Sequence, residues 1–127
     1  MHETHLYEYA VIRVVPRVER EEFVNVGIIL FCKRTRYLGV RYHLNPDKIR
    51  ALDPLADIQC LEESLNSLGL ISKGDKKGGP IAKLDVPERF RWLTATRSTI
   101  LQTSKVHPGL SVNPADTLSR LFDRLVG

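Results

Sequence analysis

The segment FVNVGIILFC, residues Phe23–Cys32, decides the fold of this chain. Apolar residues occupy both of its alternating faces, whereas a strand with one face in water alternates apolar and polar side chains. The segment is also bounded by charged and polar residues on both sides, as a strand is expected to be. We therefore predict a central β-strand that is covered on both of its faces.

Two further β-prone segments, Leu6–Val15 and Tyr37–Leu44, flank this strand in the sequence. The connections are a charged segment at 16–22 and a polar hairpin tip at 33–36, and both are too short for a crossover helix. The three segments therefore predict an antiparallel meander. In the third segment, the face that carries Arg41 is expected to be wetter than the apolar face opposite it.

Asx-Pro pairs predict the starts of helices, because a capping side chain precedes a proline that suits the first helical turn. The pairs are Asn45-Pro46, Asp53-Pro54 and Asn113-Pro114. We expect the first helix to end near Leu52 and the second to end at Gly69. Another short helix is predicted around 87–93, and a fourth strand near 99–104.

This order of elements predicts an α+β fold: an antiparallel sheet of about four strands, with an N-terminal three-stranded meander, covered by helices in two layers. The chain has 127 residues, of which 43% are hydrophobic, and this suits a single domain over residues 1–127. Whether the fourth strand pairs with the first or with the third stays open, and so does the oligomeric state.

Composition favours a soluble protein of the cytoplasm. The N-terminal MHETHLYEYA is unlike a signal peptide, and no segment reaches the roughly 18 apolar residues of a membrane span. Cys32 and Cys60 are too few for a disulfide framework, so we expect two buried thiols in a reducing compartment. The histidines lack the spacing of a metal site, and we expect neither a metal nor a cofactor.

The chain is mildly basic, with 19 Lys and Arg against 15 Asp and Glu and a net charge of +4. This excess permits an acidic partner. A nucleic-acid-binding hypothesis would use the basic loop 73–83 and strand arginines. Its residues are Lys73, Lys76, Lys77, Arg34, Arg36 and Arg41. The loop lacks the GxxxxGK[ST] pattern of a phosphate loop, and a solvated surface loop is the alternative.

The densest set of polar side chains lies in the segment ERFRWLTATRSTILQTSKVHPG, residues 88–109. Arginine forks and hydroxyls suit the recognition of phosphate or carboxylate. Together with Asn25, which interrupts the apolar central strand, the candidate ligand- or anion-binding residues are Arg91, Arg97, Ser98, Gln102 and His107. The alternative is structural: Asn25 ties a loop, and the other residues make ordinary internal hydrogen bonds.

An enzyme that handles phosphoryl groups or nucleotides is a third interpretation, centred on Arg91, Arg97, Ser98 and His107. A Ser98 nucleophile would need His107 beside it and a third group to orient the imidazole. No GxSxG motif accompanies these residues. The sequence therefore assigns no catalytic residue.

Two longer runs, YEYAVIRVVPRVEREEFVNVGIILFC (Tyr7–Cys32) and RFRWLTATRSTILQTSKVHPGL (Arg89–Leu110), resemble an uncharacterised bacterial family, domain of unknown function 3037. The resemblance covers nearly the whole chain. It implies a small stand-alone bacterial protein without an assigned activity or cofactor. It also implies a partner, because look-alike proteins are often encoded beside a HipA-like serine/threonine kinase.

The leading hypothesis from the sequence is a non-enzymatic interaction or accessory module. Its anion-binding or docking surface would lie around Arg97, and the HipA-like kinase would be its partner. Nucleic-acid binding and an enzymatic activity are the two alternatives.

Overall fold

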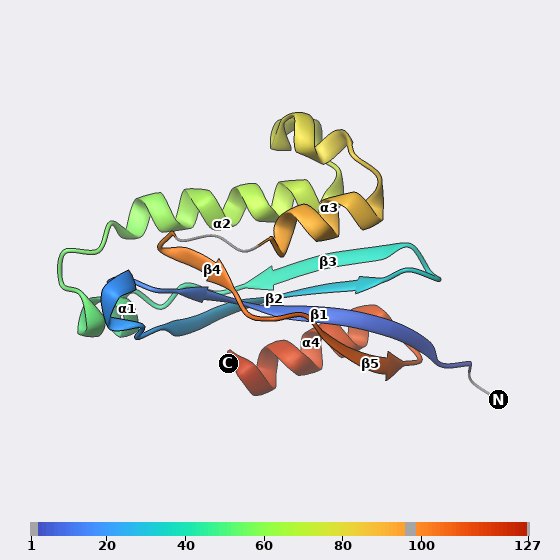
Figure 1. The fold of residues 1–127 in the computed structure, drawn as a ribbon, viewed down its shortest axis with the longest axis horizontal. Helices are drawn as coiled ribbons and strands as arrows, with labels where there is room; N and C mark the ends of the chain where they lie inside the picture. The colour runs from blue at the N-terminus through green and yellow to red at the C-terminus, as the bar shows by residue number, and fades with distance from the viewer. Residues whose placement is uncertain (1–2, 96–98, 127) are drawn as a thin grey trace.

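The computed structural model describes residues 3–95 and 99–126. A five-stranded antiparallel sheet forms the centre of the described chain (Figure 1). Strands β1 (His5–Val14), β2 (Val24–Cys32) and β3 (Tyr37–Tyr42) form the predicted meander. The α+β class and the antiparallel sheet expected from the sequence are thus confirmed.

Strand β1 has neighbours along both of its edges. Strand β2 pairs with one edge, while β4 (Leu101–Thr103) and β5 (His107–Ser111) share the other. The predicted fourth strand therefore joins the first strand of the meander and not the third. Strand β5 was not predicted, because Pro108 and Gly109 are residue types that strands usually avoid.

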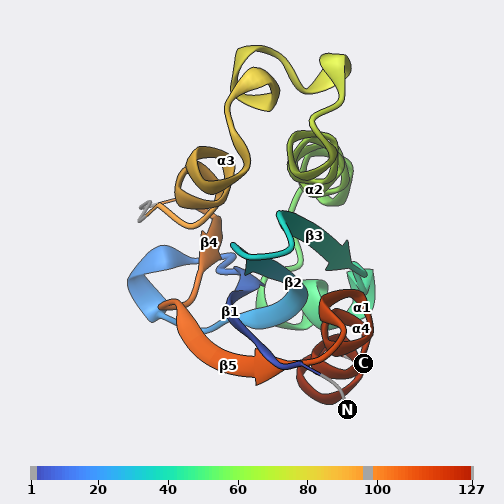
Figure 2. The ribbon, with the colours of Figure 1, turned by 90° about the vertical axis from the view of Figure 1, so that its right-hand side faces the viewer.

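Helices cover both faces of the sheet. Helices α2 (Ile58–Lys73) and α3 (Val86–Leu93) lie on one face, and α4 (Pro114–Leu125) lies on the other (Figure 2). The short helix α1 (Pro46–Leu52) follows the meander. The predicted two layers thus become three. Helix α4 packs on the face of β3 that carries Arg41. Arg41 and His43 nevertheless stay exposed, so this face is the wetter one, as expected.

Strand β2 supplies side chains to two separate hydrophobic clusters. Ile29 and Phe31 join the larger core beneath α2 and α3, whereas Ile28 and Leu30 join the smaller core beneath α4. Burial of each such side chain contributes about 1.5–3 kcal/mol relative to exposure. The prediction of a central strand covered on both faces is therefore confirmed, and it accounts for the third layer.

Helix α2 starts and ends later than the sequence predicted. The Asp53 carboxylate accepts a hydrogen bond from the Leu55 backbone N–H in a turn, and Asp57 caps the helix. Gly69 lies inside the helix, and the chain leaves it only at Gly74, which has a φ of 68°. The predicted ends at Asp53 and Gly69 are wrong, because apolar side chains continue to face the core as far as Ile71.

The segment that follows α2 is more ordered than the predicted surface loop 73–83. It contains two short 3-10 helices, Lys76–Gly78 and Pro80–Lys83. Ala82 is buried and belongs to the larger core. The loop is therefore anchored at its second half, and its lysines lie on the outside.

The two glycines of α2 predict substitutions with opposite effects. We expect Gly69→Ala to stabilise the protein by about 0.5–1 kcal/mol, because alanine loses less backbone entropy in a helix. A Cβ there would only reach Tyr42, at an ordinary 3.8 Å. Gly74→Ala should destabilise by about 1 kcal/mol, since its left-handed backbone disfavours a side chain. Urea denaturation measures both, and an equal loss in both variants would contradict the assigned helix end.

Candidate functional site

The structure brings two of the predicted site residues, Asn25 and Gln102, into one row across the sheet. Asn25 of β2 and Gln102 of β4 are both cross-strand partners of Arg13 in β1. Directly opposite residues share a face of the sheet, here the face covered by α4. Arg13 is not among the ligand-binding residues predicted from the sequence, although a charge within the apolar run AVIRVV was an available signal.

Arg13 is positioned by an aromatic ring. Its guanidinium carbon lies 4.1 Å from the centroid of the Phe23 ring, the geometry of a cation–π contact. Within the described residues, its Nε and the Oδ1 of Asn25 are both buried without a hydrogen-bond partner. These two atoms are a donor and an acceptor on paired residues of neighbouring strands, so their chemistry is complementary.

The two amides of this row make internal hydrogen bonds. Asn25 Nδ2 donates to the carbonyl oxygen of Leu125 at 3.2 Å, in the last turn of α4, where carbonyls lack helical partners. Gln102 Nε2 donates to the carbonyl oxygen of Thr99 at 2.7 Å. We interpret the row as a structural link between the sheet and α4, in line with the structural alternative for Asn25.

This structural link predicts unequal effects on stability when the two amides are removed. We expect Asn25→Ala to destabilise the protein by about 1–2 kcal/mol, because the Leu125 carbonyl and the neighbouring Arg13 would both lose a polar neighbour. Gln102→Ala, the matched control, should change stability by less than about 0.5 kcal/mol, since its bond joins residues of one turn. Urea denaturation compares them, and equal losses would show that Asn25 does not anchor α4.

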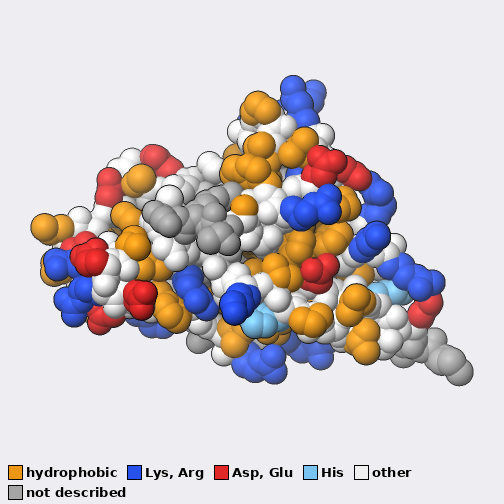
Figure 3. Space-filling view, viewed as in Figure 1, with side chains coloured by type: hydrophobic (Ala, Val, Ile, Leu, Met, Phe, Trp, Pro, Cys, Tyr) orange, Lys and Arg blue, Asp and Glu red, His pale blue; other side chains and the backbone are white. Residues whose placement is uncertain are grey.

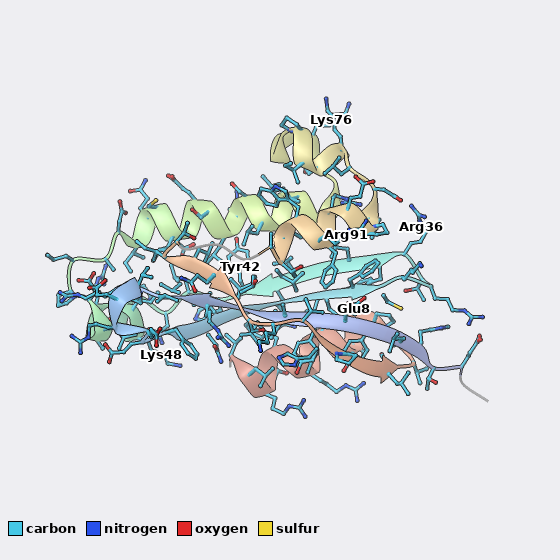
Figure 4. The ribbon with its side chains drawn as sticks, in the orientation of Figure 1. Glu8, Arg36, Tyr42, Lys48, Lys76 and Arg91 are labelled. Carbon is cyan, nitrogen blue, oxygen red and sulfur yellow. The ribbon has the colours of Figure 1, made fainter. Side chains whose placement is uncertain are left out.

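The remaining predicted ligand residues do not join this row. Arg91 is exposed on α3, on the side of the sheet that α2 covers (Figure 4). The His107 ring lies 5.3 Å from that of Tyr9, which packs on the core beneath α4. Arg91 and His107 therefore lie on opposite faces of the sheet. Arg97 and Ser98 lie outside the described residues.

The basic residues of the nucleic-acid hypothesis are divided among several surfaces. Three of them are exposed near the C-terminal end of α2: Lys73, Lys76 and Lys77. Arg34 pairs with Glu3 at 3.1 Å. Arg41 is on the α4 face, where it donates to Ser119 Oγ at 2.9 Å. Figure 3 shows Lys and Arg interspersed with Asp and Glu on the face in view, so the visible cations form no continuous stripe.

An apolar groove of about 800 Å³ runs along α2. The wall that α2 provides consists of Cys60, Leu61, Ser64, Ser67, Leu68 and Ile71. Trp92, Ile100 and Leu101 line the opposite side, and the connection between α1 and α2 closes one end with Leu55 and Ala56. The volume is within the range of about 300–1,000 Å³ that is typical of ligand sites.

Hydrophobic side chains remain in water around this groove. Leu55 is 88% exposed and Ile100 is 47% exposed. Figure 3 shows hydrophobic side chains at the surface over the connection between α1 and α2. Cys32 is buried as expected, but Cys60 is exposed, because its position on α2 faces the groove and not the sheet. The prediction of a second buried thiol is therefore wrong.

A family model described as a protein of unknown function, DUF3037, matches residues 9–126. The chain belongs to the DUF3037 family. The match spans nearly the whole chain, and it confirms the resemblance carried by the two runs at Tyr7–Cys32 and Arg89–Leu110. No curated protein and no solved structure matches this DUF3037 chain. Because the family has no assigned function, a proposal must come from the geometry.

The described part of the DUF3037 chain contains neither a candidate membrane span nor a candidate metal site. No helix there has both the length and the apolar character needed to cross a bilayer. No group of three or more His, Cys, Asp or Glu side chains in residues 3–95 and 99–126 is arranged to bind a metal ion. The groove along α2 is the best-formed candidate surface.

An ion pair joins the β2–β3 hairpin tip to the start of α3. Arg36 Nη2 lies 2.7 Å from Asp85 Oδ1, and both side chains are largely exposed. The Val86 backbone N–H and the Arg36 guanidinium hold the pKa of the Asp85 carboxyl below its usual value of 3.8. The folded state thus favours the charged carboxylate. This stabilisation is present above the unfolded pKa and is lost as the pH falls through the folded pKa.

An NMR titration of the side-chain carboxyl carbons tests this assignment. In the wild type, we expect the titration midpoint of Asp85 below its usual value of 3.8. Arg36→Gln should raise that midpoint without restoring it fully, because the Val86 N–H remains. Arg34→Gln removes a neighbouring arginine of the same hairpin tip that pairs with Glu3, and it should leave Asp85 unchanged. Equal shifts in both variants would refute a direct Arg36 contact.

Proposed function

We propose that this DUF3037 chain is a non-enzymatic interaction module that binds an amphipathic helix of a partner protein in the groove along α2. The observation that carries the proposal is the groove itself, which is apolar and bordered by the exposed side chains of Leu55 and Ile100. Apolar surface of this kind gains about 25 cal/mol for each Å² that a partner removes from water.

The dimensions of the groove favour a helix as the bound element. The wall from Cys60 to Ile71 is about 16 Å long at about 1.5 Å per residue, which corresponds to roughly three helical turns. Cys60, Ser64 and Ser67 contribute small side chains to this wall, so a second backbone can approach closely. Helix-in-groove binding is a common mode of protein recognition, in which a partner inserts apolar side chains at helical spacing.

Charge selects the orientation of the partner helix. Asp53 and Asp57 line the end of the groove where α2 begins. Asp53 lies 3.8 Å from Arg17, a long and partly exposed ion pair, and Asp57 caps α2. Both carboxylates can accept a further cationic partner, so a basic residue on the partner helix suits this end. A partner helix with one apolar stripe and a Lys or Arg at one end therefore fits best.

The HipA-like serine/threonine kinase implied by the family resemblance is the first partner to test. The groove supports an interaction module over nucleic-acid binding, for which the cations Arg34, Arg36 and Arg41 already have partners within the chain. It also supports a module over an enzyme, because Arg91 and His107 lie on opposite faces of the sheet.

Two adjacent substitutions on α2 test the groove. Ser67 lines it, whereas the neighbouring exposed Asn66 does not. We expect Ser67→Arg to weaken partner binding at least about tenfold, because the long side chain obstructs the groove. Asn66→Arg introduces the same side chain at the neighbouring position, and this variant should bind the partner with unchanged affinity. The measurement is co-expression with the kinase and the other operon neighbours, followed by calorimetric titration of the purified pair.

Both variants must first fold as the wild type does, with urea midpoints that correspond to a change of less than about 0.5 kcal/mol. Retention of full affinity in Ser67→Arg would exclude the groove as the binding site. If the wild-type protein, purified from its native cells, elutes as a monomer with no partner retained, the proposed function is wrong.

A further inference from the structure

A second cavity, the α4 pocket, lies on the opposite face of the sheet from the groove. Its volume is about 420 Å³, and it opens between α4 and the strands β1 and β5. It is lined by Tyr7, Leu110, Thr117, Arg120, Leu121 and Arg124. The α4 pocket and the groove have no lining residue in common. Its chemistry therefore requires a separate explanation.

Two guanidinium groups border the α4 pocket from one helix. Arg120 and Arg124 are four residues apart on α4, so they project from the same side of the helix, one turn from each other. The ion pair of Arg120 with Asp116 is long, at 3.8 Å, and both side chains are about 70% exposed. An exposed pair of this kind contributes little. Arg124 has no ion pair with any described residue, so both cations are available to a ligand.

A tyrosine is fixed on the opposite side of the α4 pocket. Tyr7 of β1 is the cross-strand partner of Gly109 in β5. A Cβ atom at Gly109 would overlap the Tyr7 ring, so the ring lies against the β5 backbone where only glycine leaves room. The Tyr9 ring packs on it, with centroids 6.1 Å apart. The phenol is therefore held in place before any ligand arrives.

We infer that the α4 pocket binds a phosphate monoester. Such a group carries a charge of about −1.5 to −2 at neutral pH and three acceptor oxygens. Two guanidinium forks and one phenol O–H match both the charge and the number of oxygens, whereas a carboxylate has one charge and two oxygens. This inference does not depend on the proposed helix-binding function.

The apolar walls specify an ester and not inorganic phosphate alone. Leu121 is buried beneath the pocket. Together with the Tyr7 ring it forms a hydrophobic side next to the cations. A volume of about 420 Å³ also falls within the range of about 300–1,000 Å³ for organic ligands. A phosphate with a small apolar substituent therefore fills the pocket better than the free ion.

Calorimetric titration with phenyl phosphate tests the inference on the wild-type chain. Phenyl phosphate should bind saturably. Phenyl sulfate, which has the same shape and a single charge, should bind at least about tenfold more weakly. Inorganic phosphate should also bind more weakly, because it lacks the ring that contacts Tyr7 and Leu121. Equal binding of the sulfate and phosphate esters would overturn the inference, and so would the absence of saturable binding at millimolar concentrations.

Variants then locate the bound ester. The double variant Arg120→Gln/Arg124→Gln should lose at least about tenfold in affinity, and Tyr7→Phe should lose about fivefold. Arg50→Gln, at an exposed arginine of α1, is the matched control and should bind normally. Undiminished affinity in the double variant would overturn the assignment. Ser67→Arg should leave phenyl phosphate binding unchanged, so this test and the groove test fail independently.

The source of the ester is assigned by two more titrations. A free metabolite and a phosphorylated protein side chain present the same phosphate group. Free phosphoserine and a short peptide that contains phosphoserine are the probes. At least about tenfold tighter binding of the peptide assigns a protein source, while equal affinity assigns a small metabolite. If neither of these probes nor phenyl phosphate binds the protein, the inference is overturned.

Discussion

The burial of β2 on both of its faces is the constraint on which the rest of this structure depends. Ile28 and Ile29 are neighbours in the chain, yet they belong to different hydrophobic clusters on opposite sides of the sheet. Neither cluster can exist without its helices, so α2 and α3 must cover one side and α4 the other. The amide of Asn25 then joins β2 to the end of α4 by one hydrogen bond, where the sheet and the helix meet.

Local signals were readable from the sequence, and pairings between distant segments were not. Asn45 and Asn113 cap α1 and α4 as predicted, because a cap depends on residues within one turn. Strand β5 has no local signal, since Pro108 and Gly109 disfavour strands and its formation depends on β1. The row around Arg13 depends in turn on register. The sequence pattern gives the face of a side chain but not its partner across the sheet.

The candidate sites follow the same division. Asn25 and Gln102 have the right chemistry for a binding site, but the fold uses these amides for internal hydrogen bonds. The groove along α2 had no such signal. Its small residues, such as Ser64 and Ser67, resemble an ordinary solvated helix face in sequence. A groove exists where the described residues leave apolar surface without packing partners, and this is known only once the fold is in place.

The two proposed sites lie on opposite faces of one sheet, and their independence follows from how that sheet is packed. Coupling between the two sites would need a structural element with two alternative arrangements. Binding at each site would have to favour one of these arrangements over the other. Strand β1 passes between them, but Ile12 and Val11 fix it into the two clusters on opposite faces, with exposures of 0% and 7%. Close-packed interiors resist small continuous shifts. A ligand in the α4 pocket and a helix in the groove should therefore bind without affecting each other.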